Sequence, residues 1–394
     1  MTLIAAGTTS LPMPSPGTTA MRFLALTRGT LPQNRSSRRS VSCAELRYNQ
    51  NMESTVHEKP LETVEHAARA HGEFSALIAG CGVYALPGRA LIELTSDDRV
   101  RWLNGMVTNN VRDLAAGHGV YAFLLNPQGH ILGDLYAYNR GESLHVETER
   151  SQLDRILATF DRYIIMDDVE VKNISEEVSV LGIAGPRACE VLQKAQFEIS
   201  HLAPLQFRGI SWQGAPLTLV RGDNPAVQSF ELYLTPATAS VARDALAAAG
   251  AQVVGEEALE LLRIASGVPR YGRDIRERDL PQETEQARAL NFSKGCYVGQ
   301  EIVERIRSRG AVHRMFTGFK VEGSLPASGS KIQSEGKDVG EITSSASLPI
   351  GGEFKAALGY IRREMAAKSS HLVAGESRLR IAEVPFAEVF RVAS

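Results

Sequence analysis

The sequence predicts an α+β fold made of two ferredoxin-like lobes followed by a small β-barrel. Three observations predict it. Residues 89–174 alternate between strand and helix patterns, residues 178–250 repeat a similar order, and residues 313–394 contain short strand patterns without long helical ones. An alternation of this order is typical of ferredoxin-like lobes. Short strands separated by Gly, Ser and Pro are typical of a small barrel.

The first lobe is predicted from strand alternation, helical spacing and turn residues. Its elements, in chain order, are a lead-in helix at 58–78, a strand at 89–95, a helix, strands at 119–126, 130–138 and 143–148, a helix at 151–164 and a strand at 169–174. Ser96 is expected to cap the helix that follows the first strand, and Gly105 is expected to end it. The turn residues Pro127-Gln128-Gly129 predict a hairpin.

The second lobe and the barrel follow from the same kinds of pattern. The expected elements of the second lobe are a strand at 178–185, a helix at 186–195, strands at 206–212, 216–221 and 229–235, and a helix at 237–250. Pro186 is placed to start one helix and Gly250 to end the other. We therefore expect three parts: a disordered or targeting extension at 1–57, a two-lobe domain at 58–312 and a barrel at 313–394.

Composition excludes several classes of protein. The 394 residues are 43% hydrophobic and 22% charged, with a net charge of −2, so a general electrostatic footprint for nucleic acid or membrane is absent. No apolar run reaches the ~18 residues that a membrane span needs. The four cysteines, Cys43, Cys81, Cys189 and Cys296, lie far apart. This spacing argues against a structural zinc site or a disulfide framework, so no metal site is predicted and a reducing compartment is favoured.

The first 40 residues contain five arginines and no acidic residue, and they are rich in Ser, Thr, Gly and Pro. Such a segment buries too little apolar surface to fold. It has the composition of an organelle transit peptide, but the favoured interpretation is a non-functional extension that precedes Met52 as the start of the chain. We therefore expect a cytoplasmic protein, with the mitochondrial matrix as the alternative if the segment is a transit peptide.

The octapeptide KGCYVGQE at 294–301 combines a lysine, a cysteine and two glycines. Residues 299–310 have a helical pattern, which places Cys296 in the loop before a helix. Backbone amides at a helix start and the charge of Lys294 both stabilise a thiolate, so the pattern predicts a reactive thiol. The alternative is a small buried structural cysteine. Gly295 and Gly299 are expected to allow backbone angles or close approaches that side chains would block.

The octapeptide resembles the signature of the YgfZ-type folate-binding proteins, which are relatives of the glycine-cleavage T-protein, an aminomethyltransferase. Further segments carry the resemblance across residues 85–394; they are WLNGMVTNNV, YAFLLNPQGHILGDLYAY, GVPRYGRDIRERDLPQET, DVGEITSSASLP and FKAALGYIRRE. The resemblance implies that tetrahydrofolate or a derivative binds in a cavity between the two lobes.

The resemblance also implies roles for single residues. Asp134 matches an aspartate near folate N5, and Tyr138 matches a tyrosine on the pterin side. Glu231 matches the glutamate that binds the amino-pyrimidine edge, and Arg263 matches an arginine that lines the same pocket. A carboxylate can accept two adjacent N–H donors of a pterin, and an aromatic ring can stack on its face.

The function implied by the resemblance is assistance to iron–sulfur cluster assembly or repair, with an effect on tRNA modification enzymes. Its partners would be iron–sulfur enzymes or assembly proteins. Cys296 would be the functional thiol, Lys294 would tune it, and Tyr297, Gln300 and Glu301 would shape the loop.

The alternative is a tetrahydrofolate-dependent aminomethyltransferase, so whether the chain is an enzyme stays open. Two departures from the T-protein bear on this alternative. The chain has Gly133-Asp134 where the T-protein has paired aspartates, and residues 221–229 (RGDNPAVQS) lack the T-protein's tyrosine.

Basic residues cluster beside the octapeptide, at Arg305, Arg307, Arg309, His313 and Arg314. They could hold the anionic tail of a folate or make a weak contact with tRNA phosphates. A solvated helix face without a partner is the equally weighted alternative.

Overall fold

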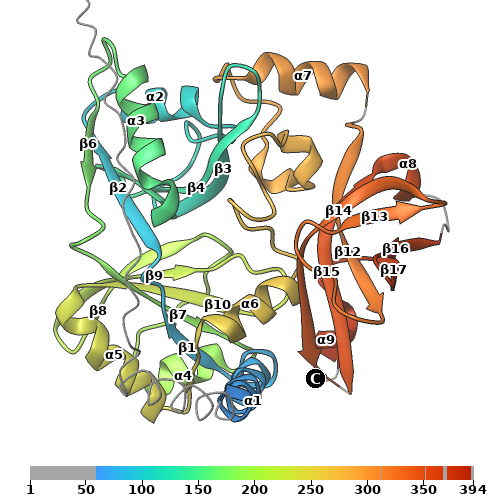
Figure 1. Cartoon of the computed structure of the whole chain (residues 1–394). Helices are drawn as coiled ribbons and strands as arrows, with labels where there is room; N and C mark the ends of the chain where they lie inside the picture. The colour runs from blue at the N-terminus through green and yellow to red at the C-terminus, as the bar shows by residue number, and fades with distance from the viewer. Residues whose placement is uncertain (1–58, 311, 351, 367–370, 392–394) are drawn as a thin grey trace, which may run out of the picture. The chain divides into compact units, whose positions relative to one another are not determined.

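Figure 1 shows the computed structural model, which describes residues 59–310, 312–350, 352–366 and 371–391. The chain divides into two units, Met1–Lys59 and Pro60–Ser394, and the features below belong to the second. The predicted extension at 1–57, with its arginines and Cys43, lies outside the described residues.

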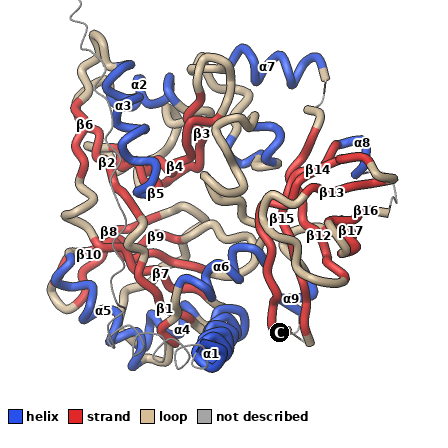
Figure 2. Tube along the Cα trace, in the orientation of Figure 1, coloured by secondary structure: helices blue, strands red, loops and turns tan. Residues whose placement is uncertain are grey.

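The first lobe is a five-stranded antiparallel sheet in the order β3-β4-β5-β2-β6. Its elements are β2 (Arg89–Thr95), α2 (Arg99–Met106), β3 (His118–Leu125), β4 (Ile131–Asn139), β5 (Leu144–Glu149), η1 (Arg150–Gln152), α3 (Leu153–Tyr163) and β6 (Glu170–Asn173). Trp102 of α2 and Phe160 of α3 pack with Leu135 and Val146 of the sheet in one buried cluster. Because successive strand residues alternate between faces, these helices cover one face, while part of the other face, at Phe123 and Ile131, packs against Ile275 and Tyr297 of the segment before the barrel. Figure 2 shows the strands and helices of this lobe.

The second lobe is a six-stranded sheet in the order β11-β1-β7-β10-β9-β8. Its elements are β1 (Gly82–Ala85), β7 (Ser179–Ala184), α4 (Ala188–Lys194), β8 (Phe207–Trp212), β9 (Ala215–Arg221), β10 (Ser229–Leu234), α5 (Pro236–Ala248) and β11 (Gln252–Val253). Val191 of α4 and Leu246 of α5 share a buried cluster with Ile183 and Leu232. Again the helices cover a single face of the sheet.

The C-terminal part is a closed barrel in the order β12-β15-β14-β13-β16-β17. Its strands are β12 (Arg314–Glu322), β13 (Lys331–Ser334), β14 (Lys337–Pro349), β15 (Glu353–Arg362), β16 (Leu372–Ala374) and β17 (Ser377–Ala382). The remaining elements are η2 (Pro281–Thr284), η3 (Ala287–Ala289) and α7 (Gln300–Arg309) before the barrel, and α8 (Arg363–Ala366) and α9 (Ala387–Arg391) within or after it.

One hydrophobic core joins the barrel to the lobes. Phe74 of α1 (Lys59–Ala79) and Leu262 of α6 (Glu256–Ala265) share a buried cluster with Phe316, Leu348 and Phe386. The predicted boundary at 312/313 falls just before β12, but the core is continuous across it. The barrel and the lobes therefore form one compact unit.

The predicted fold class is confirmed, and three details differ from the prediction. The second sheet has six strands where four were predicted, because the short strands β1 and β11 pair with one another and β1 pairs with β7. Ser96 is not the cap of α2; it has a left-handed φ of 74°, and Asp98 takes the N-cap position. Gly105 lies inside α2, which is capped by Val107. In the part of the chain that the structure describes, no helix is long and apolar enough to cross a membrane.

Candidate functional site

The inner face of the first sheet, opposite α2 and α3, carries polar and aromatic side chains. Strand pairing sets them side by side: Glu147 of β5 lies opposite both Leu91 of β2 and Tyr136 of β4. Tyr136 in turn lies opposite Tyr121 of β3. Neighbouring side chains on one sheet face are close enough to interact. The predicted residues Asp134 and Tyr138 lie on this same face, two positions before and after Tyr136 on β4.

Asp134 is held by donors on both of its carboxylate oxygens. The Tyr121 hydroxyl donates to Oδ2 at 2.7 Å, and Gln152 Nε2 donates to Oδ1 at 2.7 Å. The Gln152 side-chain oxygen accepts from the Asp134 backbone N–H at 2.9 Å, so the same amide fixes both strand and carboxylate. Asp134 is therefore a fixed acceptor whose orientation is set before any ligand arrives.

Tyr138 is buried, and its ring has close neighbours. It stacks on Tyr136 with ring centroids 6.3 Å apart and meets Phe207 edge to face at 5.8 Å. A Cβ added at Gly119 would lie 2.4 Å from the Tyr138 ring, so only glycine at 119 leaves room for it. Burial raises the pKa of the Tyr138 hydroxyl, and the nearby carboxylate of Glu147 adds to the increase.

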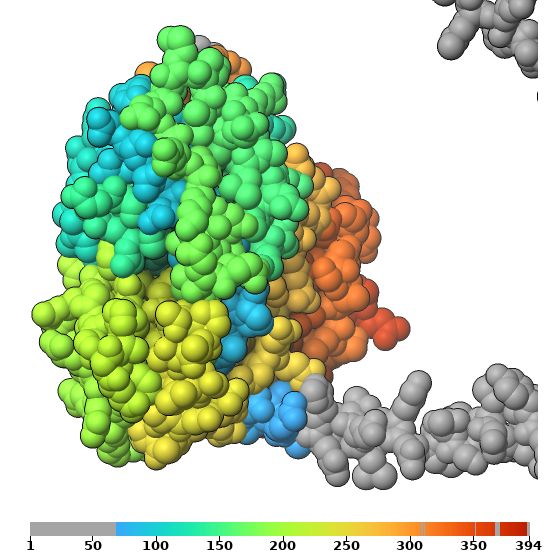
Figure 3. Space-filling view, turned by 90° about the vertical axis from the view of Figure 1, so that its left-hand side faces the viewer, coloured from blue at the N-terminus to red at the C-terminus, as the bar shows by residue number. Residues whose placement is uncertain are grey.

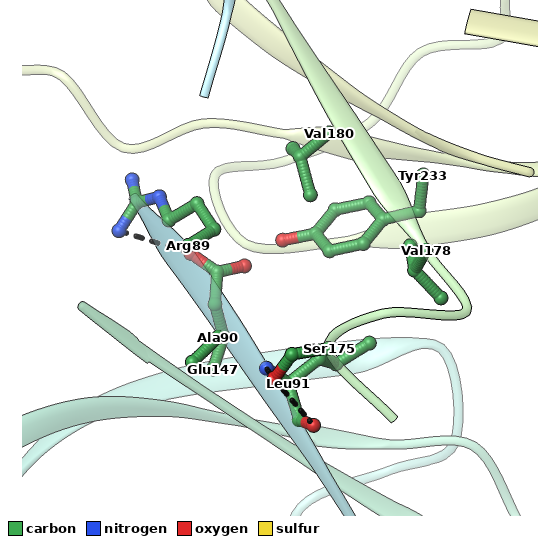
Figure 4. Close-up of a pocket in the computed structure, with 8 residues that line it drawn as sticks. All are labelled: Arg89, Ala90, Leu91, Glu147, Ser175, Val178, Val180 and Tyr233. Carbon is green, nitrogen blue, oxygen red and sulfur yellow. Dashed lines mark hydrogen bonds and ion pairs between the residues drawn. The ribbon is translucent and has the colours of Figure 1, made fainter. Parts of the chain in front are cut away.

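Glu231 faces this layer from β10 of the second sheet. Arg89 of β2 reaches across with Nη2 3.2 Å from Glu231 Oε1, and its Nη1 lies 3.1 Å from Glu147 Oε1. The Tyr233 hydroxyl donates to Glu231 Oε2 at 3.0 Å. One guanidinium thus ties a carboxylate of each sheet, and Figure 4 shows Arg89, Glu147 and the Tyr233 hydroxyl converging.

Glu147 is the most deeply buried of these carboxylates. Its side chain is 1% exposed, and neither of its oxygens accepts a hydrogen bond from a described residue. Burial raises the pKa of Glu147 to about 8; the Arg89 guanidinium acts against this increase, and the Glu231 carboxylate adds to it.

Two neighbouring hollows lie between the sheets. The inner one, about 10 Å³ and lined by Arg89, Glu147 and Tyr233 among others, has room for a single water. The outer one is a groove of about 590 Å³, within the range of small-molecule sites. Both are lined by Leu91, Val178 and Tyr233, so they adjoin. Figure 3 looks onto the side where the first lobe, blue to green, meets the second, yellow-green to yellow.

None of the four residues predicted for folate lines either hollow, and Arg263 is engaged elsewhere. The Arg263 guanidinium bonds Glu260 of its own helix, Asp274 and the Ser344 hydroxyl of the barrel. Asp274, fully buried, also accepts from Thr343 and Ser344. Arg263 therefore fastens α6 to the barrel, and the structure does not bring it into hydrogen-bond contact with Asp134, Tyr138 or Glu231.

Lys294 of the octapeptide is a buried clamp. Its Nζ donates to three backbone carbonyls at the end of α2, those of Asn104 at 2.5 Å, Val107 at 2.5 Å and Asn109 at 2.7 Å. Burial lowers the pKa of Lys294 to about 7, while the three carbonyl dipoles favour the ammonium and act against that decrease. The predicted tuning of Cys296 by Lys294 has no direct contact behind it among the residues described.

The rest of the octapeptide also fixes the loop. Tyr297 is buried, and the Val298 backbone N–H donates to the Gly105 carbonyl at 3.1 Å. Gly299 has a φ of 80°, and a Cβ there would lie 2.6 Å from the Asn126 carbonyl oxygen. The expectation for Gly299 is confirmed. The expectation for Gly295 is wrong, because its φ is not positive and an added Cβ would meet nothing within 4 Å.

Gln300 and Glu301 begin α7, as predicted, and the Gln300 backbone N–H donates to the Tyr297 carbonyl at 3.1 Å. The acidic side chain of Glu301 pairs with Arg305 one turn later. Neither side chain is buried. Both residues therefore contribute to the loop through the helix that they start.

Cys296 is the exposed thiol of this loop. Cys189 is partly buried and Cys81 is buried, and burial raises the pKa of the Cys81 thiol to about 12. Within the described ranges, no group of three or more His, Cys, Asp or Glu side chains could hold a metal ion.

The basic cluster beside the loop is largely paired with acids. Arg305 pairs with Glu301 and Arg307 with Glu304, each within α7. Arg314 is bound by Asp279 and Glu283. The side chain of Arg309 lies outside the described ones. These pairs reduce the positive charge that is free to meet a phosphate.

Sequence reasoning missed Arg89, Tyr121, Glu147 and Gln152, which complete the inner layer. Glu147 sits in the predicted strand at 143–148, where the alternation of LHVETE separates it from the buried Val146. That alternation was a usable signal for an inward acid, but only the position of the second sheet turns it into a site.

Two family models match the chain. Residues 47–294 match the GCVT N-terminal domain, and residues 314–387 match the CAF17 C-terminal beta-barrel domain. An Arabidopsis thaliana protein, named as a chloroplastic "putative transferase", is 27% identical over 75% of this chain and 68% of its own length. The aminomethyltransferase of Rubrobacter xylanophilus is 28% identical over 70% and 75% of the two chains. The crystal structure of aminomethyltransferase T of the Bartonella henselae glycine cleavage system superposes with a TM-score of 0.72 at 20% identity, covering 81% of this chain and 90% of that one.

Proposed function

Because the chain belongs to the GCVT N-terminal domain family, whose model matches more than half of it, we propose that it binds a tetrahydrofolate-type pterin between its two sheets. The observation that carries this proposal is the layer of carboxylates and tyrosines on the facing sides of the sheets. Members of the family are named aminomethyltransferases, and the folate comes to this chain as part of the proposal.

The residues present fit such a ligand. A pterin offers adjacent N–H donors, which a carboxylate accepts in pairs. Glu147 is a buried carboxylate whose oxygens accept no hydrogen bond from the described residues, so acceptor capacity is available there. Asp134, oriented by Tyr121 and Gln152, would supply a second fixed acceptor. The folate itself would supply the one-carbon chemistry.

Titration calorimetry with tetrahydrofolate under anaerobic conditions tests the proposal. The wild-type chain should bind, and Glu231→Ala should weaken binding, because it removes one carboxylate and releases Arg89 from its tie across the sheets. Glu190→Ala, on the surface of α4, is the matched control and should bind as wild type does. Unchanged affinity in Glu231→Ala would place the ligand elsewhere.

For the biological role, we propose assistance to iron–sulfur cluster assembly or repair, with Cys296 as the functional thiol and iron–sulfur enzymes as partners. The support is the resemblance of the octapeptide, the CAF17 barrel match and the exposure of Cys296 on a loop that Lys294 holds in place. A single thiolate cannot ligate a stable four-cysteine cluster, so any cluster contact would be shared with a partner.

A deletion strain complemented with variants tests this role. Wild type and Cys189→Ala, the control at a partly buried cysteine, should restore the activities of iron–sulfur enzymes, including those that modify tRNA. Cys296→Ala should not, although it should still bind tetrahydrofolate. Full rescue by Cys296→Ala would remove the thiol from the mechanism.

The second candidate function is aminomethyl transfer to tetrahydrofolate. It is favoured by the names of the relatives and by the retained, fully oriented Asp134. The assay is formation of methylene-tetrahydrofolate from an aminomethyl-lipoyl donor. Robust turnover that survives Cys296→Ala would establish this function in place of the assembly role.

Direct tRNA binding is the weakest of the proposed contacts, because Arg305, Arg307 and Arg314 are each paired with acids.

For location we propose the cytoplasm, with an organelle as the alternative that the arginine-rich start and the chloroplastic relative support. Fusing residues 1–57 to a fluorescent protein tests this: diffuse fluorescence agrees with the proposal, and import into an organelle overturns it.

A further inference from the structure

Two large apolar side chains lie exposed in the loop between α3 and β6. Ile165 is 81% exposed and Met166 is 93% exposed, whereas the other exposed large apolar side chains in the described part of the chain lie between 38% and 52%. Figure 1 shows this loop projecting beyond the end of α3. Single exposed apolar residues are common on protein surfaces. Two adjacent ones at the end of a loop form a continuous apolar surface, which is typical of an interaction site.

The chain is held in place on both sides of this apolar pair. Before the pair, the Trp102 indole N–H of α2 donates to the Tyr163 carbonyl at 3.2 Å. After it, the Asp98 backbone N–H donates to the Asp168 carbonyl at 3.1 Å, and the Asp168 backbone N–H donates to Asp98 Oδ2 at 3.0 Å. A loop that is fixed in this way loses little conformational entropy when a partner covers it, so its preorganisation favours binding.

Acidic side chains surround the apolar pair. The loop and the segment that bonds to it, residues 161–170 and 95–101, contain six acids and three arginines: Asp97, Asp98, Asp161, Asp167, Asp168 and Glu170, with Arg99, Arg101 and Arg162. Arg101 pairs with two of these acids, Asp98 and Asp167. Within the residues that the structure describes, no cation pairs with the side chains of Asp97, Asp161 or Asp168. The local excess of negative charge is therefore larger than the −2 of the whole chain.

This charge decides what can cover the apolar pair. A second copy of the chain would bring the same acids against these, and like charges across an interface lower affinity. The anionic surface of a membrane would repel the acids in the same way. The complementary surface is that of a different protein, with an apolar pocket that is rimmed by lysines or arginines.

We propose that Ile165 and Met166, with the acids around them, are a docking site for a partner protein that carries such a pocket. This inference rests on the proposed assembly role and adds to it the surface that the partner binds. One end of α2 bonds to this loop, and the carbonyls at its other end bind Lys294 of the octapeptide. Since a helix of eight residues is about 12 Å long, an interface of standard size can span the docking site and the loop of Cys296.

Complementation of the deletion strain, scored on iron–sulfur enzyme activities, tests the docking site. The double variant Ile165→Ser/Met166→Ser should leave these activities near those of the deletion strain, because it removes the apolar anchors of the interface. The matched control is Val241→Ser/Val253→Ser, which removes two exposed apolar side chains from the second lobe and should rescue as wild type does. Both double variants should keep the wild-type melting temperature and tetrahydrofolate affinity, since they change only exposed side chains.

Photocrosslinking of the full chain in cells shows what covers the site. Met166→p-benzoylphenylalanine should give a product with a different protein, whereas the same substitution at Val241 should give none. Adding Asp161→Lys/Asp168→Lys should reduce the yield of this product at least about tenfold, because it places positive charge against the basic rim of the partner.

The outcomes separate the two proposals. If wild type does not restore the activities, the assembly role fails, and the inference fails with it. If wild type and Ile165→Ser/Met166→Ser restore them equally, the inference alone fails. A product of twice the mass of the chain, a product with lipid, or no product at position 166 would also overturn it. Should the serine variant not fold, the crosslinking still decides.

Discussion

Replacing Lys294 with methionine removes an ammonium while keeping most of the apolar stem. The ammonium makes three short hydrogen bonds, to the carbonyls of Asn104, Val107 and Asn109. Without it, these carbonyls at the end of α2 lose a buried donor, and the loop at 294–299 loses its tie to the first lobe. The variant should therefore be less stable and should hold the loop less firmly.

The size of the effect follows from the three bonds. Hydrogen bonds to charged groups contribute about 1.5–3 kcal/mol each to stability. Burial of Lys294, which is 5% exposed, offsets part of this sum, as its lowered pKa indicates. Taking the lower end for each bond and allowing for the offset, we expect the free energy of unfolding to fall by about 3 kcal/mol, as when one partner of a buried polar pair is removed.

Urea unfolding of wild type and Lys294→Met, followed by circular dichroism, measures the loss. Alkylation of Cys296 in the native state provides the local readout, and its rate should change once the loop is released. Lys331→Met removes an exposed lysine paired with Glu341 and should cost no more than about 0.5 kcal/mol. If Lys294→Met is as stable as this control, the three hydrogen bonds of Lys294 do not stabilise the fold.

Three further predictions follow from contacts already described. In the native protein, Cys296 should alkylate faster than Cys189, because only Cys296 is exposed; equal, slow labelling would contradict this. Gly299→Ala should destabilise the chain by about 2 kcal/mol or more in urea unfolding, because its φ is positive and its Cβ would meet a backbone oxygen, whereas Gly295→Ala should be neutral. Arg263→Met should cost about 3–5 kcal/mol, because it leaves the buried Asp274 without its cation; calorimetric melting measures the loss, and an unchanged melting temperature would show that the barrel junction does not need the pair.

Strands of the lobes such as β4 were predictable because one face is buried more deeply than the other. In β4 the buried positions alternate with half-buried ones, which is the pattern a half-covered strand must have. The short strands β1 and β11 were not predictable, because they pair with one another and with β7 across long stretches of chain. Ser96 was misplaced because its left-handed φ carries no signal in its residue type.

The site was predictable only in part for a similar reason. Asp134, Tyr138 and Glu231 came from a resemblance, and the structure places the first two on one sheet and the third on the sheet that faces it. Glu147 lies in a strand that was predicted, but its surroundings depend on side chains from β2 and β10: it pairs with Arg89 and accepts no hydrogen bond from the described residues. No local pattern encodes such an absence.

The sequence of the octapeptide suggests a chemical role for each of its residues, but the structure gives most of them a structural role. Lys294 has the charge expected of a group that activates a thiol, yet its three bonds are to carbonyls about 190 residues earlier in the sequence. Tyr297 is buried and Gly299 is required by a close backbone approach. Cys296, by contrast, is exposed. If the loop were only a structural joint, serine or alanine at 296 would serve equally well, so a functional defect confined to Cys296 substitutions in a normally folded chain is what distinguishes chemistry from architecture there.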